Sequence, residues 1–152
     1  MNESAFDPQT FMNIEIAGEM ETRYTPVTPG TYPATIDGID IREVTNDRGS
    51  SFLLDVTYLI HDEALAEAMG MERVTVRQGI FLEVEPNGNI ALGPNKNVKL
   101  GRLREAVGQN KSGPWSFAML QGAGPVNITV SNAPDKNDPT IVYSRVDKVV
   151  AI

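Results

Sequence analysis

Apolar and polar residues alternate through most of the chain after residue 30, and this alternation predicts half-buried β-strands. The alternation changes phase at Gly38, and the apolar positions before and after it are Tyr32, Ala34, Ile36, Ile39 and Ile41. A glycine at a phase change predicts one long strand bent by a β-bulge. A second strand is predicted over 51–60, after the turn signal at 46–49. These two strands should form an antiparallel pair.

The next elements predicted are a short helix and a third strand. Strong helix formers over 62–69 end at Gly70, where a helix would stop. Alternation resumes over 74–84, and it places four polar or aromatic residues on the face opposite the apolar ones: Arg73, Thr75, Arg77 and Phe81. We therefore expect a solvent-facing row of side chains along the third strand.

The second half of the chain predicts a basic helix and two more strands. The helix spans 98–108, with Leu100 and Leu103 on its apolar side, and the strands span 126–130 and 141–151. Five strands with a helix between the third and the fourth are the order of an OB fold, a partly open barrel that commonly binds oligonucleotides. The predicted fold is therefore mainly β, a five-stranded OB-fold barrel with a short helix between strands 3 and 4. A small β-sandwich is the alternative.

Composition excludes several classes of function. The chain has 152 residues, which suits one domain, and it contains no cysteine, so disulfides, thiolate catalysis and cysteine-based metal sites are excluded. No stretch is apolar enough to span a membrane, and no secretory signal is recognisable, so we expect a cytoplasmic protein, in the host cytoplasm if it is viral. We expect no cofactor.

Charge is distributed unevenly along this acidic chain, whose formal net charge is −7. Residues 1–30 have a formal charge of −4 and are punctuated by prolines, and we interpret them as an extended acidic arm before a domain at 31–152. Phe6, Phe11 and Ile14 are candidates to dock this arm onto the domain. Residues 96–111 have a formal charge of +4 and lead to Trp115, the single tryptophan.

Several short patterns give the chain a family resemblance. They lie at 97–110, 115–117 and 120–122, and also at 6–8, 29–32 and 143–146. Together they resemble a family of small bacteriophage proteins that look like single-stranded DNA-binding proteins with an OB fold. The resemblance implies a non-enzymatic role in phage DNA replication or recombination. Many bacterial-type members of that functional class end in an acidic recruiting tail, whereas this chain ends in a predicted strand, so the acidic arm is the candidate recruiter of replication or recombination proteins.

Sequence-tolerant binding to a single strand needs cations along the backbone and aromatic faces on which bases stack. The candidate residues of both kinds are Arg42, Arg48, Tyr58, Arg73, Arg77, Phe81, Lys96, Lys99, Arg102, Lys111 and Trp115. Tyr58 and Phe81 are also good candidates for the core, and Trp115 could plug one end of the barrel. The basic helix could line the binding groove or only cap the barrel, so we give more weight to the arginines of the strands.

Two other functions remain open from the sequence. An acidic β-rich domain with an arm would also serve as a virion structural or assembly protein. Glu83 and Glu85, with Asp55 or Asp37, could in principle hold magnesium for a nuclease. His61 has no second histidine or cysteine with which to build a catalytic or metal site, so we expect no enzyme. Self-association into a homo-oligomer is expected through an exposed strand or the arm.

Overall fold

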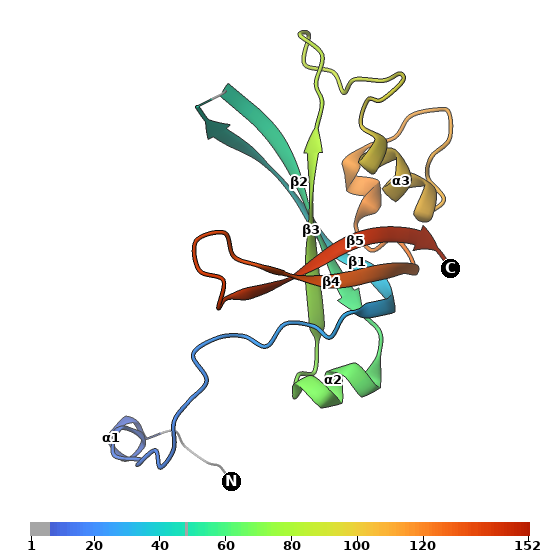
Figure 1. The fold of residues 1–152 in the computed structure, drawn as a ribbon. Helices are drawn as coiled ribbons and strands as arrows, with labels where there is room; N and C mark the ends of the chain where they lie inside the picture. The colour runs from blue at the N-terminus through green and yellow to red at the C-terminus, as the bar shows by residue number, and fades with distance from the viewer. Residues whose placement is uncertain (1–6, 48) are drawn as a thin grey trace.

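Five strands form one antiparallel sheet in a computed structural model that describes residues 7–47 and 49–152. The strands are β1 (Gly30–Asn46), β2 (Gly49–Ile60), β3 (Val74–Leu82), β4 (Val126–Pro134) and β5 (Val142–Ala151). Their order across the sheet is β3-β2-β1-β4-β5. β1 and β2 form a long hairpin that projects to one side, and β4 and β5 form a second hairpin (Figure 1). The mainly β fold and its five strands are confirmed.

β1 is a single strand with a bulge at the place where the sequence changes phase. Ile36 pairs with Tyr58, whereas Gly38 pairs with Thr57, so Asp37 is the inserted residue. Gly30–Ala34 pair with β4 and Ala34–Asn46 pair with β2, and the bulge bends β1 within this second stretch. The predicted bend and the predicted antiparallel pairing of the first two strands are both confirmed.

The core lies on the face of the sheet that the alternation predicts. On β2 the side chains of Leu54, Val56, Tyr58 and Ile60 are buried, and they meet buried residues of β3 and β4. Full burial of each large apolar side chain contributes about 1.5–3 kcal/mol. Phe52 has the same parity but is partly exposed, because it lies in the projecting part of the hairpin.

Among the described residues, four short helices connect or precede the strands: α1 (Pro8–Met12), α2 (Glu63–Met69), α3 (Val98–Ala106) and the 3-10 helix η1 (Phe117–Leu120). Asp62 caps α2 by accepting a hydrogen bond from the Leu65 N–H at 3.0 Å, and Gly70 ends it with φ 66°. The predicted helices at 62–69 and 98–108 are thus present, whereas the pattern did not indicate α1 or η1. The described part of the chain contains no helix long and apolar enough to cross a membrane.

The sheet does not close into a barrel. β3 and β5 are its two end strands, and no hydrogen-bonded pairing joins them among the described residues. Helix α3 packs beside both strands, with Leu100, Leu103 and Ala106 buried. The OB-fold barrel expected from the sequence is therefore not confirmed, because no pairing of β3 with β5 completes it and α3 lies beside both strands.

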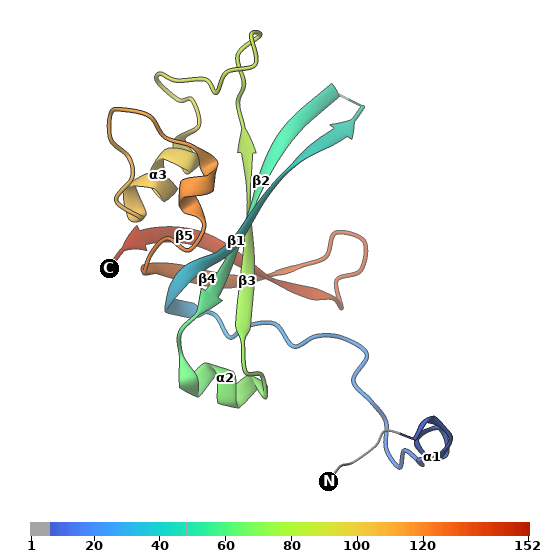
Figure 2. The same cartoon turned by 180° about the vertical axis from the view of Figure 1, so that it is seen from behind.

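The acidic arm enters the sheet at Val27, which is buried and donates its N–H to Ser144 Oγ at 2.8 Å. Before this point the arm runs away from α3, as both views show (Figure 1 and Figure 2). Phe11 and Ile14, which were candidates to dock the arm, are largely exposed. Phe6 lies outside the described residues. Docking of the arm through these residues therefore stays a prediction.

Candidate nucleic-acid interface

One face of the β1–β2–β3 part of the sheet points away from the core, and we call it the outer face. The strand register places Arg42, Leu53 and Phe81 in one row across this face. Residues paired across antiparallel strands project to the same side, so these three side chains share the outer face. A second row, two residues further along each strand pair, contains Asp40, Asp55 and Gly79.

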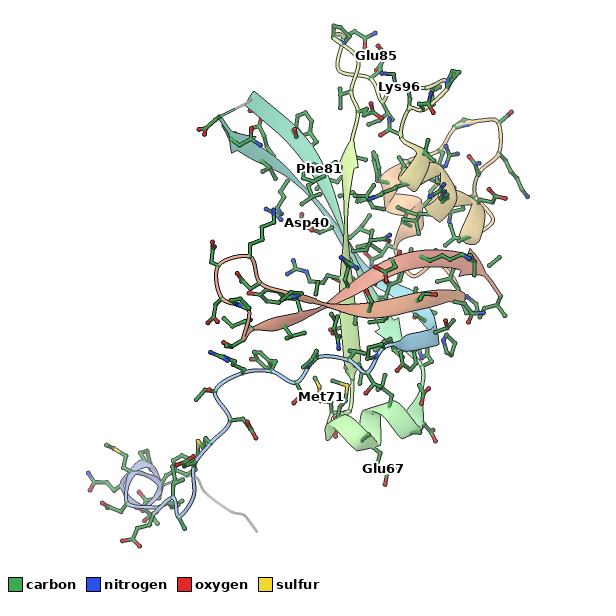
Figure 3. The ribbon with its side chains drawn as sticks, viewed as in Figure 1. Asp40, Glu67, Met71, Phe81, Glu85 and Lys96 are labelled. Atoms are coloured by element: carbon green, nitrogen blue, oxygen red, sulfur yellow. The ribbon has the colours of Figure 1, made fainter. Side chains whose placement is uncertain are left out.

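Phe81 is an exposed aromatic residue in this row. Its relative exposure is 64%, and it lies on β3 near the β1–β2 hairpin (Figure 3). Beside it, Leu53 is buried, because its side chain leans over Gly79: a Cβ at position 79 would stand 3.4 Å from Leu53 Cδ1. The missing side chain at Gly79 thus gives Leu53 room to lie flat on the sheet. The exposed Phe81 ring therefore projects beside a flat apolar surface formed by Leu53, which we call the apolar floor, and this arrangement leaves space for a base to stack on the ring.

Arg42 is fixed on the outer face by an ion pair. Its Nε donates to Asp55 Oδ2 at 2.8 Å, and Asp55 is one of the few buried charged groups of the domain. The guanidinium has four further N–H donors beyond the one that Asp55 accepts. Arg42 is therefore oriented by the protein and still has donors for a phosphate.

Arg77 lies in a third row of the outer face, with Thr57 and Gly38. It is exposed, as the alternation along β3 predicts, and it also lines the gap between β3 and β5. Arg73 lies just before β3 and donates from Nη2 to Asp37 Oδ1 at 2.8 Å. This surface pair ties the start of β3 to the bulge in β1, so Arg73 has a structural partner at the end of the outer face.

The gap between β3 and β5 is hollow, and we call it the β3–β5 groove. Its volume is about 790 Å³, and its walls are residues of β3, α3 and β5. Five cationic side chains line it, against two acidic ones: Arg77, Lys99, Arg102, Arg145 and Lys148 against Glu105 and Asp147. A positive groove on a chain of net charge −7 is a local concentration of charge that attracts anions.

Arg145 and Asp147 form a charged pair at the wall of this groove. Arg145 Nε donates to Asp147 Oδ1 at 2.8 Å, and Arg145 Nη2 donates to Ser131 Oγ at 3.3 Å. A hydrogen bond from Ser131 and the neighbouring Arg145 hold the pKa of Asp147 below its usual value. The Asp147 carboxylate therefore stays ionised and offsets part of the positive charge.

The basic stretch at 96–111 is divided between several places. Lys99 and Arg102 of α3 face the β3–β5 groove. Lys96 lies in the loop above α3, near Glu83 at an N–O distance of 3.7 Å, and Lys111 lies exposed in the loop after α3 (Figure 3 labels Lys96). The apolar side of the helix therefore packs beside β3 and β5, while two of its cations face the β3–β5 groove.

Two aromatic candidates are not free to stack on bases. Tyr58 is fully buried and donates its hydroxyl to Gln78 Oε1 at 2.6 Å, and burial raises the pKa of this hydroxyl. Trp115 donates from Nε1 to Gln109 Oε1 at 2.8 Å, and the Arg104 guanidinium lies 4.3 Å from its ring centroid. Tyr58 is a core residue, and Trp115 is part of the packing that holds the loop after α3. Arg48 lies outside the described residues.

The groove also includes residues that the sequence reasoning did not select. Arg145 and Lys148 lie on β5, where each is exposed and directly precedes a buried valine, Val146 and Val149. Their alternation with valines indicated an exposed face of the last strand. No local signal indicated that this face would adjoin β3 and α3, because that proximity comes from the sheet topology.

Three of the four carboxylates considered for magnesium are engaged with other partners. Asp55 pairs with Arg42 and Asp37 with Arg73, while Glu83 Oε2 accepts a hydrogen bond from the Asn97 N–H at 3.0 Å. Across residues 7–47 and 49–152, no group of three or more His, Asp or Glu side chains is arranged to hold a metal ion. His61 lies directly after β2, with Nε2 at 2.9 Å from Thr35 Oγ1.

In comparisons with known proteins, the chain matches no family model and no curated protein sequence.

Proposed function

We propose that this protein binds single-stranded DNA without sequence preference, through the outer face of β1–β2–β3. The observation that carries the proposal is the row of Arg42, Leu53 and Phe81, in which an oriented cation and an exposed aromatic ring flank an apolar floor. Cations that track the backbone, together with aromatic rings that stack on bases, are the two elements of sequence-tolerant single-strand binding.

The spacing within the row supports a single strand. Arg42 and Phe81 lie on strands that are both neighbours of β2, so their backbones are about 10 Å apart. A base stacked on Phe81 would leave its phosphate within reach of a long arginine side chain at that distance. In a duplex, the base faces are already stacked on one another, so Phe81 would have no partner. Arg77, two residues from the row of Asp40 and Gly79, extends the same track towards the β3–β5 groove.

The fold proposed with this function is an opened OB fold. The strand order and the helix between the third and fourth strands agree with that fold, and the last pairing, between β3 and β5, is replaced by the groove. The proposed setting, phage DNA replication or recombination in the host cytoplasm, is supported by the sequence resemblance alone.

Titration of fluorescently labelled oligonucleotides by anisotropy tests the proposal. We expect tighter binding to a single strand than to a duplex, weakened steeply by salt through counterion release. Absence of binding at low salt would overturn the proposal and favour an assembly role. Loss of the oligonucleotide only when divalent cations are present would favour a nuclease.

Two arginine variants localise the binding face. Arg77→Ala should weaken binding and lower the log–log salt slope by about 0.7, the effect of one phosphate contact on a single strand. Arg104→Ala should weaken binding less, because Arg104 is engaged with Trp115 and donates to the Gln109 carbonyl at 3.0 Å. Equal losses for the two variants would show that the outer face is the wrong surface.

A further inference from the structure

The β3–β5 groove lies between two strand edges that have no partner. β3 is hydrogen-bonded to β2 on one side and β5 to β4 on one side, and within the described residues neither pairs on its other side. Unpaired strand edges present backbone N–H and C=O groups that can bind another extended chain. β3 and β5 approach each other closely over part of their length, so an added strand can pair along the β5 edge that lines the groove but cannot lie between both edges throughout.

One end of the gap is already occupied by the chain itself. Residues Tyr24–Val27 of the arm lie against the beginnings of β3 and β5, where they line a smaller hollow of about 320 Å³. The open part of the gap begins beyond this point and follows residues 144–151 of β5. Eight residues of extended strand span about 26 Å, which sets the length of chain that the groove can hold.

The arm contains a segment of matching length and pattern, Asn13–Met20. Its alternate residues Ile14, Ile16, Gly18 and Met20 would form one face of a strand, and Asn13, Glu15, Ala17 and Glu19 the other. In the structure this segment is not part of any helix or strand, and Ile14 and Ile16 are 59% and 67% exposed. As a strand, this segment would have one apolar face and one face with two acids. Such a strand can add to the edge of a sheet whose neighbouring surface is partly apolar and partly basic.

We propose that the β3–β5 groove binds the Asn13–Met20 segment from the arm of a second copy of this chain, which adds to the sheet as an extra strand. Its apolar face would lie on the apolar part of the groove, where Val150 and Ala151 of β5 are exposed next to buried Val149. Its two glutamates would lie among the five groove cations. A second copy is the donor because each arm runs away from its own groove (Figure 1 and Figure 2).

The charges explain why this pairing is selective. Two β5 edges would bring Arg145 and Lys148 of one copy near those of the other, with only partial compensation by Asp147, and two β3 edges would bring two copies of Arg77 together. Like charges in apposition disfavour such pairing, and charged residues on edge strands are a common protection against it. An acidic strand from the arm meets the same edges with the opposite charge. The groove thus rejects copies of its own strands and accepts the arm.

Self-association of the full-length protein tests the proposal by sedimentation velocity over a wide range of concentration. The wild-type protein should form dimers or longer assemblies as concentration rises. Ile14→Asp/Ile16→Asp should weaken this association by tenfold or more, because the strand would then place two carboxylates on the apolar part of the groove. Leu92→Asp is the matched control, since Leu92 is also exposed, at 82%, and lies outside the arm and the groove.

A peptide experiment locates the receiving site. A labelled peptide of residues 11–22 is titrated onto full-length Ile14→Asp/Ile16→Asp protein, whose own arm would compete poorly. We expect saturable binding of this peptide. Its affinity should fall at least tenfold when the protein also carries Lys99→Glu/Arg102→Glu. Binding to that charge-reversed protein should recover when Glu15 and Glu19 of the peptide are changed to lysine. A scrambled peptide of the same composition should bind at least tenfold more weakly.

Three results would overturn the proposal. Wild-type protein that stays monomeric and binds no peptide would show that the groove takes no strand. Equal binding of the scrambled peptide would show attraction by charge alone. A monomer whose own arm blocks the peptide until Ile14 and Ile16 are replaced would show that the donor is the same chain. Oligonucleotide binding by the Ile14→Asp/Ile16→Asp monomer is measured separately, so failure here is distinguishable from failure of the proposed DNA binding.

Discussion

Replacement of Phe81 by alanine separates stacking on the outer face from every other source of DNA affinity. The phenyl ring keeps 64% of its surface exposed, so most of it makes no contribution to the folded core. Full burial of a phenylalanine side chain contributes about 1.5–3 kcal/mol, and the buried third of this ring therefore accounts for about 1 kcal/mol or less. Phe81→Ala should thus fold normally and lose little stability.

The loss of DNA affinity should be larger than the loss of stability. Stacking of one base on an aromatic side chain contributes about 1–3 kcal/mol, and about 1.4 kcal/mol corresponds to a tenfold change in Kd. Phe81→Ala should therefore raise the Kd for a single-stranded oligonucleotide between about fivefold and about 150-fold. Because the ring is uncharged, the plot of log Kd against log salt should shift without a change of slope, in contrast to the expectation for Arg77→Ala.

Anisotropy titrations at several salt concentrations measure both quantities. Phe52→Ala is the matched control, because Phe52 is also a partly exposed phenylalanine but points to the opposite face of the β1–β2 hairpin. Its Kd should stay within twofold of the wild-type value. A Phe81→Ala protein that is folded and binds DNA as tightly as the wild type would refute base stacking at this position. A loss that is equal in Phe52→Ala would refute the choice of face.

Three further predictions concern the structure that supports these surfaces. Asn97→Ala should lower the free energy of unfolding by about 2 kcal/mol in chemical denaturation, because the Asn97 side chain makes hydrogen bonds of 2.8, 2.9 and 2.9 Å to the loop before α3. Asn95→Ala, which shares the left-handed backbone, is the control for strain, and an equal loss there would contradict this explanation. Tyr58→Phe should cost about 1 kcal/mol and leave the Kd for DNA unchanged, since its hydroxyl bonds only within the core; a weaker Kd would show that this residue reaches DNA. Tyr143→Phe should raise the depressed pKa of Asp135 part of the way to 3.8 in an NMR titration, because a backbone N–H is the larger cause of the shift and the tyrosine hydroxyl the second. The stabilisation linked to this carboxylate is present above pH 3.8 and is lost as pH falls through its lower folded pKa, and an unchanged Asp135 pKa in the variant would exclude the tyrosine as a cause.

The strands could be predicted from the sequence because their pattern is local. Ile36 and Ile39 belong to opposite parities on either side of Gly38, and this change of phase alone locates the bulge that the register confirms. The short helix at 62–69 was equally accessible, since Asp62 and Gly70 are ordinary signals for its two ends. Alternation also placed Arg77 and Phe81 on the exposed face of β3, where the structure has them. Local signals were sufficient for these residues because each depends on its neighbours along the chain.

The other features of the fold and of the candidate site depend on which segments become neighbours in space, and no local pattern in the sequence contains that information. Leu53 has the parity of an exposed residue, yet it is buried, because Gly79 on the adjacent strand leaves room for it. The sequence predicts Arg104 as a solvent-facing charge on the helix. In the structure, however, its guanidinium lies over the Trp115 ring and donates a hydrogen bond to the Gln109 carbonyl. Arg145 and Lys148 of β5 line the same groove as Arg77 and Arg102 only because the fold brings β5, β3 and α3 together. A single substitution that fills the outer face, Gly79→Val, would test this dependence. The new Cβ would already touch Leu53 Cδ1 at 3.4 Å, so the two γ-methyl groups of valine should displace Leu53 and weaken DNA binding without adding or removing a charge. Unchanged binding by a folded Gly79→Val protein would mean that the floor beside Phe81 is not part of the interface.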